Sequence, residues 1–170
     1  MSYFHSRPSL YFPHPLTADE DGLLAIGGDL SIDRLILAYR MGIFPWYSEN
    51  QPILWWAPKE RFVIGTGHLH VPRSMRKYLN KPIFHITVDQ HFDYVIQRCR
   101  DSPRRDQAGT WITDAMKKAY RSLHHAGLAH SVEAWYDNEI VGGLYGVGIG
   151  KIFSGESMFS EVSDASKFCV

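Results

Sequence analysis

Residues 141–150 read VGGLYGVGIG, and residues 155–160 read GESMFS. The β-branched and aromatic residues of the first run are typical of strands, while its glycines let a ligand approach the backbone closely. The second run carries one carboxylate, Glu156, among glycine, serine and apolar residues. That glutamate is either a surface residue on a half-exposed strand or a functional group, and the run alone does not decide between them. We expect the two runs to be strands that form the floor of a pocket.

Helix and turn signals on both sides of these runs predict an α+β fold. Ser31 is a good helix N-cap and Gly42 a stop signal, and Thr113 and Gly127 bracket another helix in the same way. The expected helices cover residues 31–41, 74–79, 92–99 and 113–127, with a polar loop at residues 100–109. The expected strands cover residues 84–88, 130–135, 140–147 and 151–159, the last three consecutive and antiparallel with a tight turn at residues 137–138.

The chain changes character near Arg61. Most of the prolines and a cluster of aromatic residues precede it, whereas regular helix and strand signals follow it. We therefore expect an N-terminal domain at residues 1–61 and a second domain at residues 62–170. Residues 164–170 begin like a helix and stop as its apolar side starts, which is unusual for a chain end. This pattern predicts that the second domain is incomplete at its C-terminal end.

Composition limits the location and the partners of the chain. Its 170 residues include 18 Lys plus Arg and 18 Asp plus Glu, so the net charge gives no sign of nucleic-acid or membrane binding. The two cysteines, Cys99 and Cys169, are far apart, which favours a reducing compartment. No run approaches the ~20 apolar residues of a membrane span, and the N-terminus lacks a signal-peptide core. We expect a cytoplasmic protein that does not engage a membrane.

Basic residues nevertheless gather in one short segment, which contains no acid. They are Arg73, Arg76, Lys77 and Lys81. A solvated helix face explains such a run, and so does a groove that follows the phosphates of single-stranded RNA.

Aromatic residues form the second group of candidates. Trp46 follows Phe44-Pro45 in a polar loop, so we expect its ring to be less buried than that of Trp135 in a strand. Trp111 lies just ahead of a helix start. Core packing is the ordinary role of such rings, and stacking on a base is the functional one.

Metal and nucleophile motifs are absent from the sequence. The nine histidines do not pair with cysteine or an acid at zinc-like spacing, so we expect no metal site. There is no Gly-x-Ser-x-Gly elbow and no phosphate loop ending in Gly-Lys-Ser/Thr.

Six blocks of the sequence, taken in order, resemble the leucyl/phenylalanyl-tRNA protein transferase family. The blocks are GLLAIGGDL (22–30), YRMGIFPW (39–46), ILWW (53–56), TWI (110–112), AHSVE (129–133) and GESMF (155–159). The resemblance implies transfer of leucine or phenylalanine, and less readily methionine, from aminoacyl-tRNA to a protein with an N-terminal arginine or lysine, which marks that protein for degradation. It also implies a reaction without cofactor or metal, and a monomer at full length. The implied fold is a small N-terminal domain packed on an acetyltransferase-like domain with a mainly antiparallel sheet.

The resemblance also implies roles for single residues. It places Trp46, Trp111, Tyr39 and Tyr120 around the 3′-terminal adenosine of the tRNA, and Leu144, Phe153, Glu156 and Met158 at the aminoacyl pocket. It places Arg73, Arg76, Lys77 and Lys81 on the tRNA backbone.

The chain departs from the family pattern at three places. Leu144 stands where some relatives have methionine, and Asn80 stands where some have a cation. The family's Asp-x-Gln catalytic pair is absent, which leaves Glu156 as the catalytic candidate within the chain and predicts that these 170 residues alone are inactive.

Three other classes of function stay open at this point, and one of them is a catalytically dead fragment that still folds. An acyl-CoA-dependent acetyltransferase would share the sheet, although no arginine- and glycine-rich pyrophosphate loop follows a strand. A non-catalytic RNA-binding fragment would explain the basic run and the aromatic rings but not Glu156.

Overall fold

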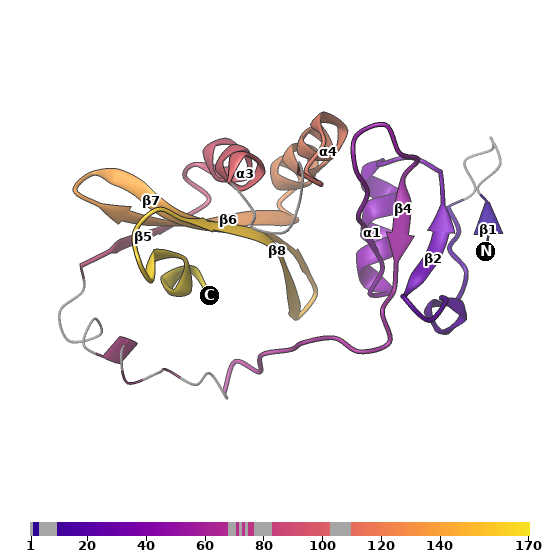
Figure 1. Ribbon diagram of the computed structural model, residues 1–170, viewed down its shortest axis with the longest axis horizontal. Helices are drawn as coiled ribbons and strands as arrows, with labels where there is room; N and C mark the ends of the chain where they lie inside the picture. Colours follow the sequence, from indigo (N-terminus) through magenta and orange to yellow (C-terminus); the bar gives the residue numbers. More distant parts are fainter. Residues whose placement is uncertain are drawn as a thin grey trace.

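The computed structural model describes residues 2–3, 10–67, 71, 73, 75–76, 83–102 and 110–170. The N-terminal part contains a small four-stranded sheet in the order β1-β2-β4-β3. Its elements are β1 (Ser2–Tyr3), η1 (Pro15–Thr17), β2 (Leu23–Ile26), α1 (Ile32–Arg40), β3 (Phe44–Pro45) and β4 (Leu54–Trp56). Helix α1 lies between this sheet and the rest of the chain (Figure 1).

The second sheet has the order β5-β6-β7-β8 and is antiparallel throughout. Its strands are β5 (His85–Val88), β6 (Ala129–Tyr136), β7 (Glu139–Ile149) and β8 (Ile152–Ser160). Helices α3 (Phe92–Asp101) and α4 (Asp114–His125) lie on one face, and the short η2 (Ala165–Cys169) lies on the other (Figure 1). The predicted α+β class and the consecutive antiparallel strands are therefore confirmed.

Local signals explain where the helices begin and end. The Thr113 hydroxyl accepts a hydrogen bond from the Met116 amide at 3.2 Å and caps α4, as predicted. Helix α1 follows Ser31, but Ser31 makes no side-chain capping bond, and the Asp29 carboxylate accepts from the Ser31 amide at 2.9 Å instead. Gly42 and Gly127 both have φ near +70°, the conformation that ends a helix most easily at glycine.

Two predicted features fall partly outside the described residues. Of the basic helix expected at 74–79, the structure describes Met75 and Arg76, which are helical together with Arg73. Of the polar loop expected at 100–109, the first two residues continue and end α3. The described residues contain no helix that is long and apolar enough to cross a membrane.

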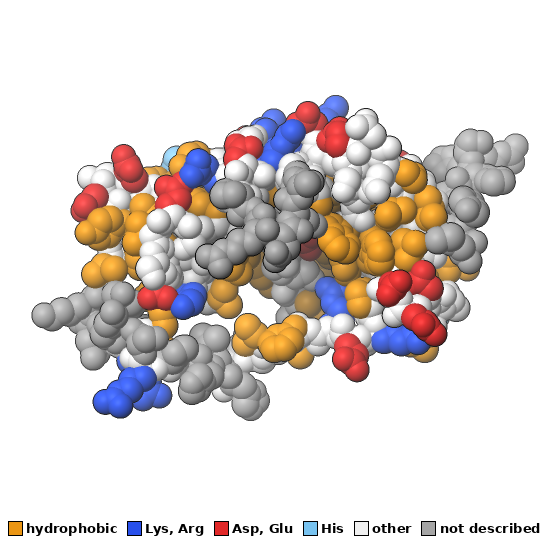
Figure 2. Space-filling model, viewed as in Figure 1, with side chains coloured by type: hydrophobic (Ala, Val, Ile, Leu, Met, Phe, Trp, Pro, Cys, Tyr) orange, Lys and Arg blue, Asp and Glu red, His pale blue; other side chains and the backbone are white. Residues whose placement is uncertain are grey.

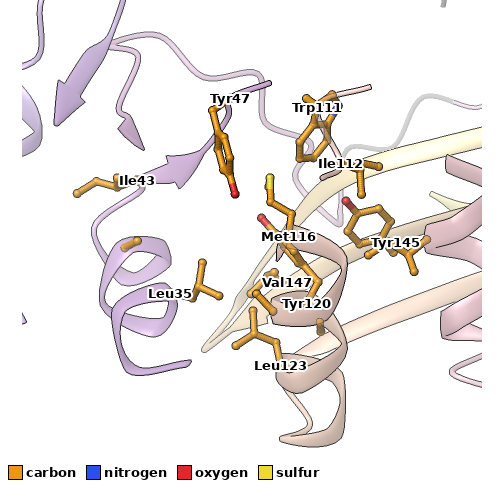
Figure 3. Close-up of a cluster of buried hydrophobic side chains, with 14 of the residues drawn as sticks. Leu35, Ile43, Tyr47, Trp111, Ile112, Met116, Tyr120, Leu123, Tyr145 and Val147 are labelled. Atoms are coloured by element: carbon orange, nitrogen blue, oxygen red, sulfur yellow. The ribbon is translucent and has the colours of Figure 1, made fainter. Parts of the chain in front are cut away.

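One hydrophobic core joins the N-terminal part to the second sheet. Leu35 and Ile43 come from the N-terminal part, and Met116, Tyr120 and Leu123 come from α4. Figure 3 shows Leu35 facing Leu123 and Tyr120 across the junction, whereas Ile43 points away from α4. The two parts on either side of Arg61 thus share buried apolar surface, which holds α1 against α4 and β7.

Three glycines of β7 serve packing within the chain, so they do not let a ligand approach the backbone as we expected. A Cβ at Gly143 would lie 2.7 Å from the Phe159 ring, and one at Gly142 would lie 2.8 Å from Ala165. A Cβ at Gly146 would lie 2.4 Å from the Ser154 carbonyl oxygen. These three positions admit neighbouring parts of the same chain. The pocket itself lies at the two strands that the sequence predicted, where Leu144 of β7 and residues 155–158 of β8 line it.

Candidate functional site

Glu156 lies in a β-bulge on the edge strand β8. Tyr145 of β7 pairs with Ser157, and Gly146 pairs with Gly155, so Glu156 is left without a partner between them. A bulge of this kind inserts one extra residue and re-aims the side chain, and bulges are common beside active sites. The acid that the sequence singled out is therefore also the point where the strand departs from regular pairing.

The Glu156 carboxylate meets two tyrosines from two other elements. The Tyr120 hydroxyl, on α4, donates to Glu156 Oε2 at 3.2 Å, and the Tyr39 hydroxyl, on α1, lies 2.5 Å from the Tyr120 hydroxyl. The two rings meet edge to face with centroids 6.5 Å apart. Tyr39 and Tyr120, which the resemblance placed around the tRNA adenosine, thus lie next to Glu156, which it placed at the aminoacyl pocket.

Burial and neighbours set the charge of this cluster. Burial raises the pKa of Glu156 from 4.5 to about 7, although the hydrogen-bonding hydroxyls of Tyr39 and Tyr120 and the positive charge of Arg61 act in the opposite direction. Burial and the nearby carboxylate raise the pKa of both tyrosines, so both hydroxyls keep their protons at neutral pH.

Arg61 lies in the linker after β4 and is attached to the N-terminal part. Its guanidinium donates to the Gly42 carbonyl at 3.2 Å and lies 4.8 Å from the Phe44 ring centroid. Sequence reasoning placed a domain boundary at Arg61 but gave the residue no role. Its positive charge opposes the rise in the pKa of Glu156 that burial causes.

A pocket of about 340 Å³ opens beside the bulge. It is lined by Leu144, Gly155, Glu156, Ser157 and Met158. Leu144 and Met158 are direct cross-strand partners, which explains why they meet there. Phe153 is not in this lining. It precedes the bulge on β8, its ring lies against Gly146 of β7, and the residue is 46% exposed.

The predicted aromatic residues separate into two kinds. Trp46 is 42% exposed and backs onto Trp56, with ring centroids 5.5 Å apart and the Trp56 indole N–H donating to the Trp46 carbonyl at 2.7 Å. Trp111 is only 8% exposed and belongs to the hydrophobic core. The free face for stacking is therefore on Trp46, and its support by Trp56 was not anticipated.

A further contact links the Trp46 loop to α4. The Tyr47 hydroxyl lies 3.3 Å from the Thr113 hydroxyl at the N-terminus of that helix. Sequence reasoning did not identify this pair, because its members are far apart in the chain and neither stands in a motif. Tyr39 and Tyr47 thus make two separate hydroxyl links from the N-terminal part to one helix.

The basic run is only partly visible. Arg73 and Arg76 are exposed, whereas Lys77 and Lys81 lie outside the described residues.

Figure 2 shows apolar side chains on the surface of the linker that follows β4, where Phe62, Val63 and Ile64 are exposed. Within the described part of the chain, no group of three or more potential metal ligands comes together.

A carboxyl with a pKa near neutrality, set on a bulged strand beside a small pocket with apolar and polar lining, suits an enzyme of the group-transfer or acid–base class. Comparison with known proteins specifies the family. The family model described as leucyl/phenylalanyl-tRNA protein transferase matches residues 63–170, and the model of that family's N-terminal domain matches residues 28–59. The chain belongs to this family.

Individual relatives agree with that assignment. The chain is 52% identical over all of its length to a leucyl/phenylalanyl-tRNA protein transferase of Thermodesulfovibrio yellowstonii, of which it covers 69%. It is 54% identical over 158 residues to the namesake of Flavobacterium johnsoniae, a match that covers 93% of this chain and 74% of the relative. The relative in Pectobacterium carotovorum is 54% identical over 170 residues, with 99% of this chain and 71% of the relative covered. These matches favour the transferase over an acetyl-CoA enzyme or a plain RNA-binding module.

Proposed function

We propose that the chain forms the larger part of an aminoacyltransferase that moves leucine or phenylalanine from aminoacyl-tRNA to the N-terminal arginine or lysine of a protein. The family assignment supports the reaction class. The observation that carries the site is Glu156, set in a bulge between a small apolar pocket and the tyrosines of two different elements. A pocket of about 340 Å³ is at the small end of the usual range for ligand sites, which suits one amino-acid side chain.

The reaction is the aminolysis of an ester. The lone pair of the acceptor's α-amine attacks the carbonyl carbon, the new C–N bond forms, and the bond to the tRNA ribose oxygen breaks. The attacking nitrogen loses a proton, and the ribose oxygen gains one. An α-amine has a pKa of ~7.7–8.0, so a useful fraction is already neutral at pH 7 and the enzyme needs a moderate proton acceptor with good positioning.

Glu156 suits the role of proton acceptor. Its pKa of about 7 lies close to the working pH, where a general base is most effective. When ionised, the same carboxylate also attracts an ammonium or a guanidinium, so it orients the donor's amino group or the acceptor's basic side chain. Leu144 and Met158 supply the apolar wall on which the leucine or phenylalanine side chain lies.

The tRNA end is assigned to the N-terminal part and to the basic run. The exposed Trp46 ring offers a stacking surface for the terminal adenine, worth roughly 1–3 kcal/mol. The hydroxyls of Tyr39 and Tyr120 lie between this part and Glu156. Buried Trp111 supports the start of α4 instead of stacking openly. The basic residues 73–81 are assigned to the acceptor-stem phosphates.

The test joins these 170 residues to the portion of the Thermodesulfovibrio relative that the match does not cover. Labelled phenylalanine should move from Phe-tRNA to a peptide that begins with arginine or lysine. The same peptide with an acetylated N-terminus is the control and should receive none. Acetyl transfer from acetyl-CoA, without transfer from Phe-tRNA, would refute the proposal.

A further inference from the structure

Three polar groups from three separate elements form one hydrogen-bonded line at the junction of the two parts. Tyr39 comes from α1, Tyr120 from α4 and Glu156 from the bulge of β8. The distances are 2.5 Å between the two hydroxyls and 3.2 Å from Tyr120 to the carboxylate. The line therefore begins in the N-terminal part and ends at the pocket.

The direction of this line follows from counting protons. A tyrosine hydroxyl has one proton, and that of Tyr120 is donated to Glu156. While Glu156 is ionised, the bond between the tyrosines is therefore donated by Tyr39 and accepted by Tyr120. Donation by Tyr39 strengthens donation by Tyr120, because hydrogen bonds in a chain polarise one another. The position of α1 therefore affects the strength of the hydrogen bond that the Glu156 carboxylate accepts.

We propose that Tyr39 is a positioning residue for Glu156, so that the pocket carboxylate is correctly oriented only when the N-terminal part is docked on α4. The proposal rests on the proposed function for the importance of Glu156, but its hydrogen-bonding content is independent of any reaction. Both parts of the chain then contribute residues to the site. A ligand that moves α1 also changes the orientation and the pKa of the Glu156 carboxylate.

The charged and titratable groups around Glu156 are few. Tyr39 and Tyr120 face it directly, Arg61 acts on it from the linker, and Tyr145 of β7 packs against the Tyr120 ring with centroids 5.6 Å apart. Among these groups only Tyr39 and Arg61 belong to the N-terminal part and its linker. Removing the Tyr39 hydroxyl therefore isolates the contribution of α1 while leaving the Arg61 charge in place.

The experiment is a ¹³C NMR titration of the 170-residue chain labelled at the glutamate carboxyl carbon, with the Glu156 signal assigned by its loss in Glu156→Gln. The wild-type midpoint is expected at about 7. Tyr39→Phe should raise the midpoint by roughly 0.5 to 1 pH unit, since the ionised carboxylate loses the stabilisation that the Tyr39 hydroxyl gives it through Tyr120. Tyr120→Phe should raise it at least as much.

The matched control is Tyr47→Phe. Tyr47 is also a largely buried tyrosine of the N-terminal part that links to α4 through its hydroxyl, but its partner is Thr113 and not the Glu156 line. This variant should leave the Glu156 midpoint unchanged. Circular dichroism establishes that each variant is folded.

Two results would overturn the proposal. If Tyr39→Phe leaves the midpoint where it was, the Tyr39 hydroxyl is not connected to the carboxylate. If Tyr39→Phe and Tyr47→Phe shift the Glu156 midpoint equally, the shift is caused by a general loosening of the junction. Neither outcome depends on transfer activity, so failure here is distinguishable from failure of the transfer assay.

Discussion

The two faces of the second sheet are covered very differently. On one face, Tyr145 and Val147 of β7 are buried under α3 and α4 and join the core that reaches α1. On the other face, η2 covers Leu144 near Ala165, while Met158 is 47% exposed on the same side. The difference separates two tasks: the covered face holds the fold together, and the open face carries the apolar wall of the pocket.

The largest expected effect is on transfer activity, and it should come from covering the open face. A polypeptide of these 170 residues alone should transfer no phenylalanine from Phe-tRNA, because water enters the pocket beside Met158, which is 47% exposed, and weakens electrostatic positioning. The version extended to the length of the relatives should be active. Robust transfer by the 170 residues alone would mean that the open face is already sufficient for catalysis. Sedimentation should also show self-association of the shorter polypeptide, since exposed apolar surface favours it.

The next effect compares one residue from each face. Leu123→Ala removes a fully buried side chain from the core and should lower the free energy of unfolding by roughly 2–5 kcal/mol. Met158→Ala removes a half-exposed side chain and should cost less than about 1 kcal/mol. Urea unfolding followed by circular dichroism measures both. Equal losses would show that the open face contributes to stability as much as the covered one.

The sequence predicted the covered face better than the open one. Thr113, Gly42 and Gly127 act locally, so the helix limits they set were correct. The bulge at Glu156 depends on pairing between two strands, and the close packing at Gly146 depends on the position of the Ser154 backbone. Neither feature follows from the local sequence, so neither was predicted.

Long-range contacts explain the remaining differences at the site. Glu156 could be singled out because it is the one acid in an apolar run. The burial of Trp111 and the support of Trp46 by Trp56 depend on how the N-terminal part meets α4 and β4. No local pattern encodes those contacts, so they could not be predicted from the sequence.

A smaller effect concerns the charge of Glu156, whose carboxylate is hydrogen-bonded to Tyr120 of α4 on the covered face. The pKa of Glu156 is raised from 4.5 to about 7 on folding, so the folded state holds its proton more tightly and stability is lost as pH rises through that window. Glu156→Gln removes this loss. The variant should match the wild type near pH 4.5 and exceed it above pH 7, by at most about 3 kcal/mol. Urea unfolding at both ends of the window is the measurement, and equal pH dependence of the two proteins would contradict the raised pKa.

Trp46 tests whether the N-terminal part contributes binding in addition to packing. Trp46→Ala should weaken binding of Phe-tRNA by roughly 1–3 kcal/mol, the usual value of one stacked base, while the melting temperature changes little because the ring is 42% exposed. Trp56→Phe, which keeps a ring but loses the indole donor to the Trp46 carbonyl, should have a weaker effect in the same direction. Filter binding at fixed salt compares them, and unchanged affinity in Trp46→Ala would remove this ring from the tRNA site.

The smallest effect is expected at the basic run, where each cation contributes a single phosphate contact. Salt dependence is measured as the slope of log affinity for Phe-tRNA against log salt concentration. Replacing Arg73 and Arg76 together by glutamine should reduce the magnitude of this slope by about 2, because fewer counterions are released on binding. Arg121→Gln is the control: Arg121 is paired with Asp93 at 2.6 Å, so its charge is already balanced and its loss should leave the slope unchanged. An unaltered slope in the double variant would make these exposed arginines an ordinary solvated surface, and phosphate contacts would then have to come from other cations of the chain.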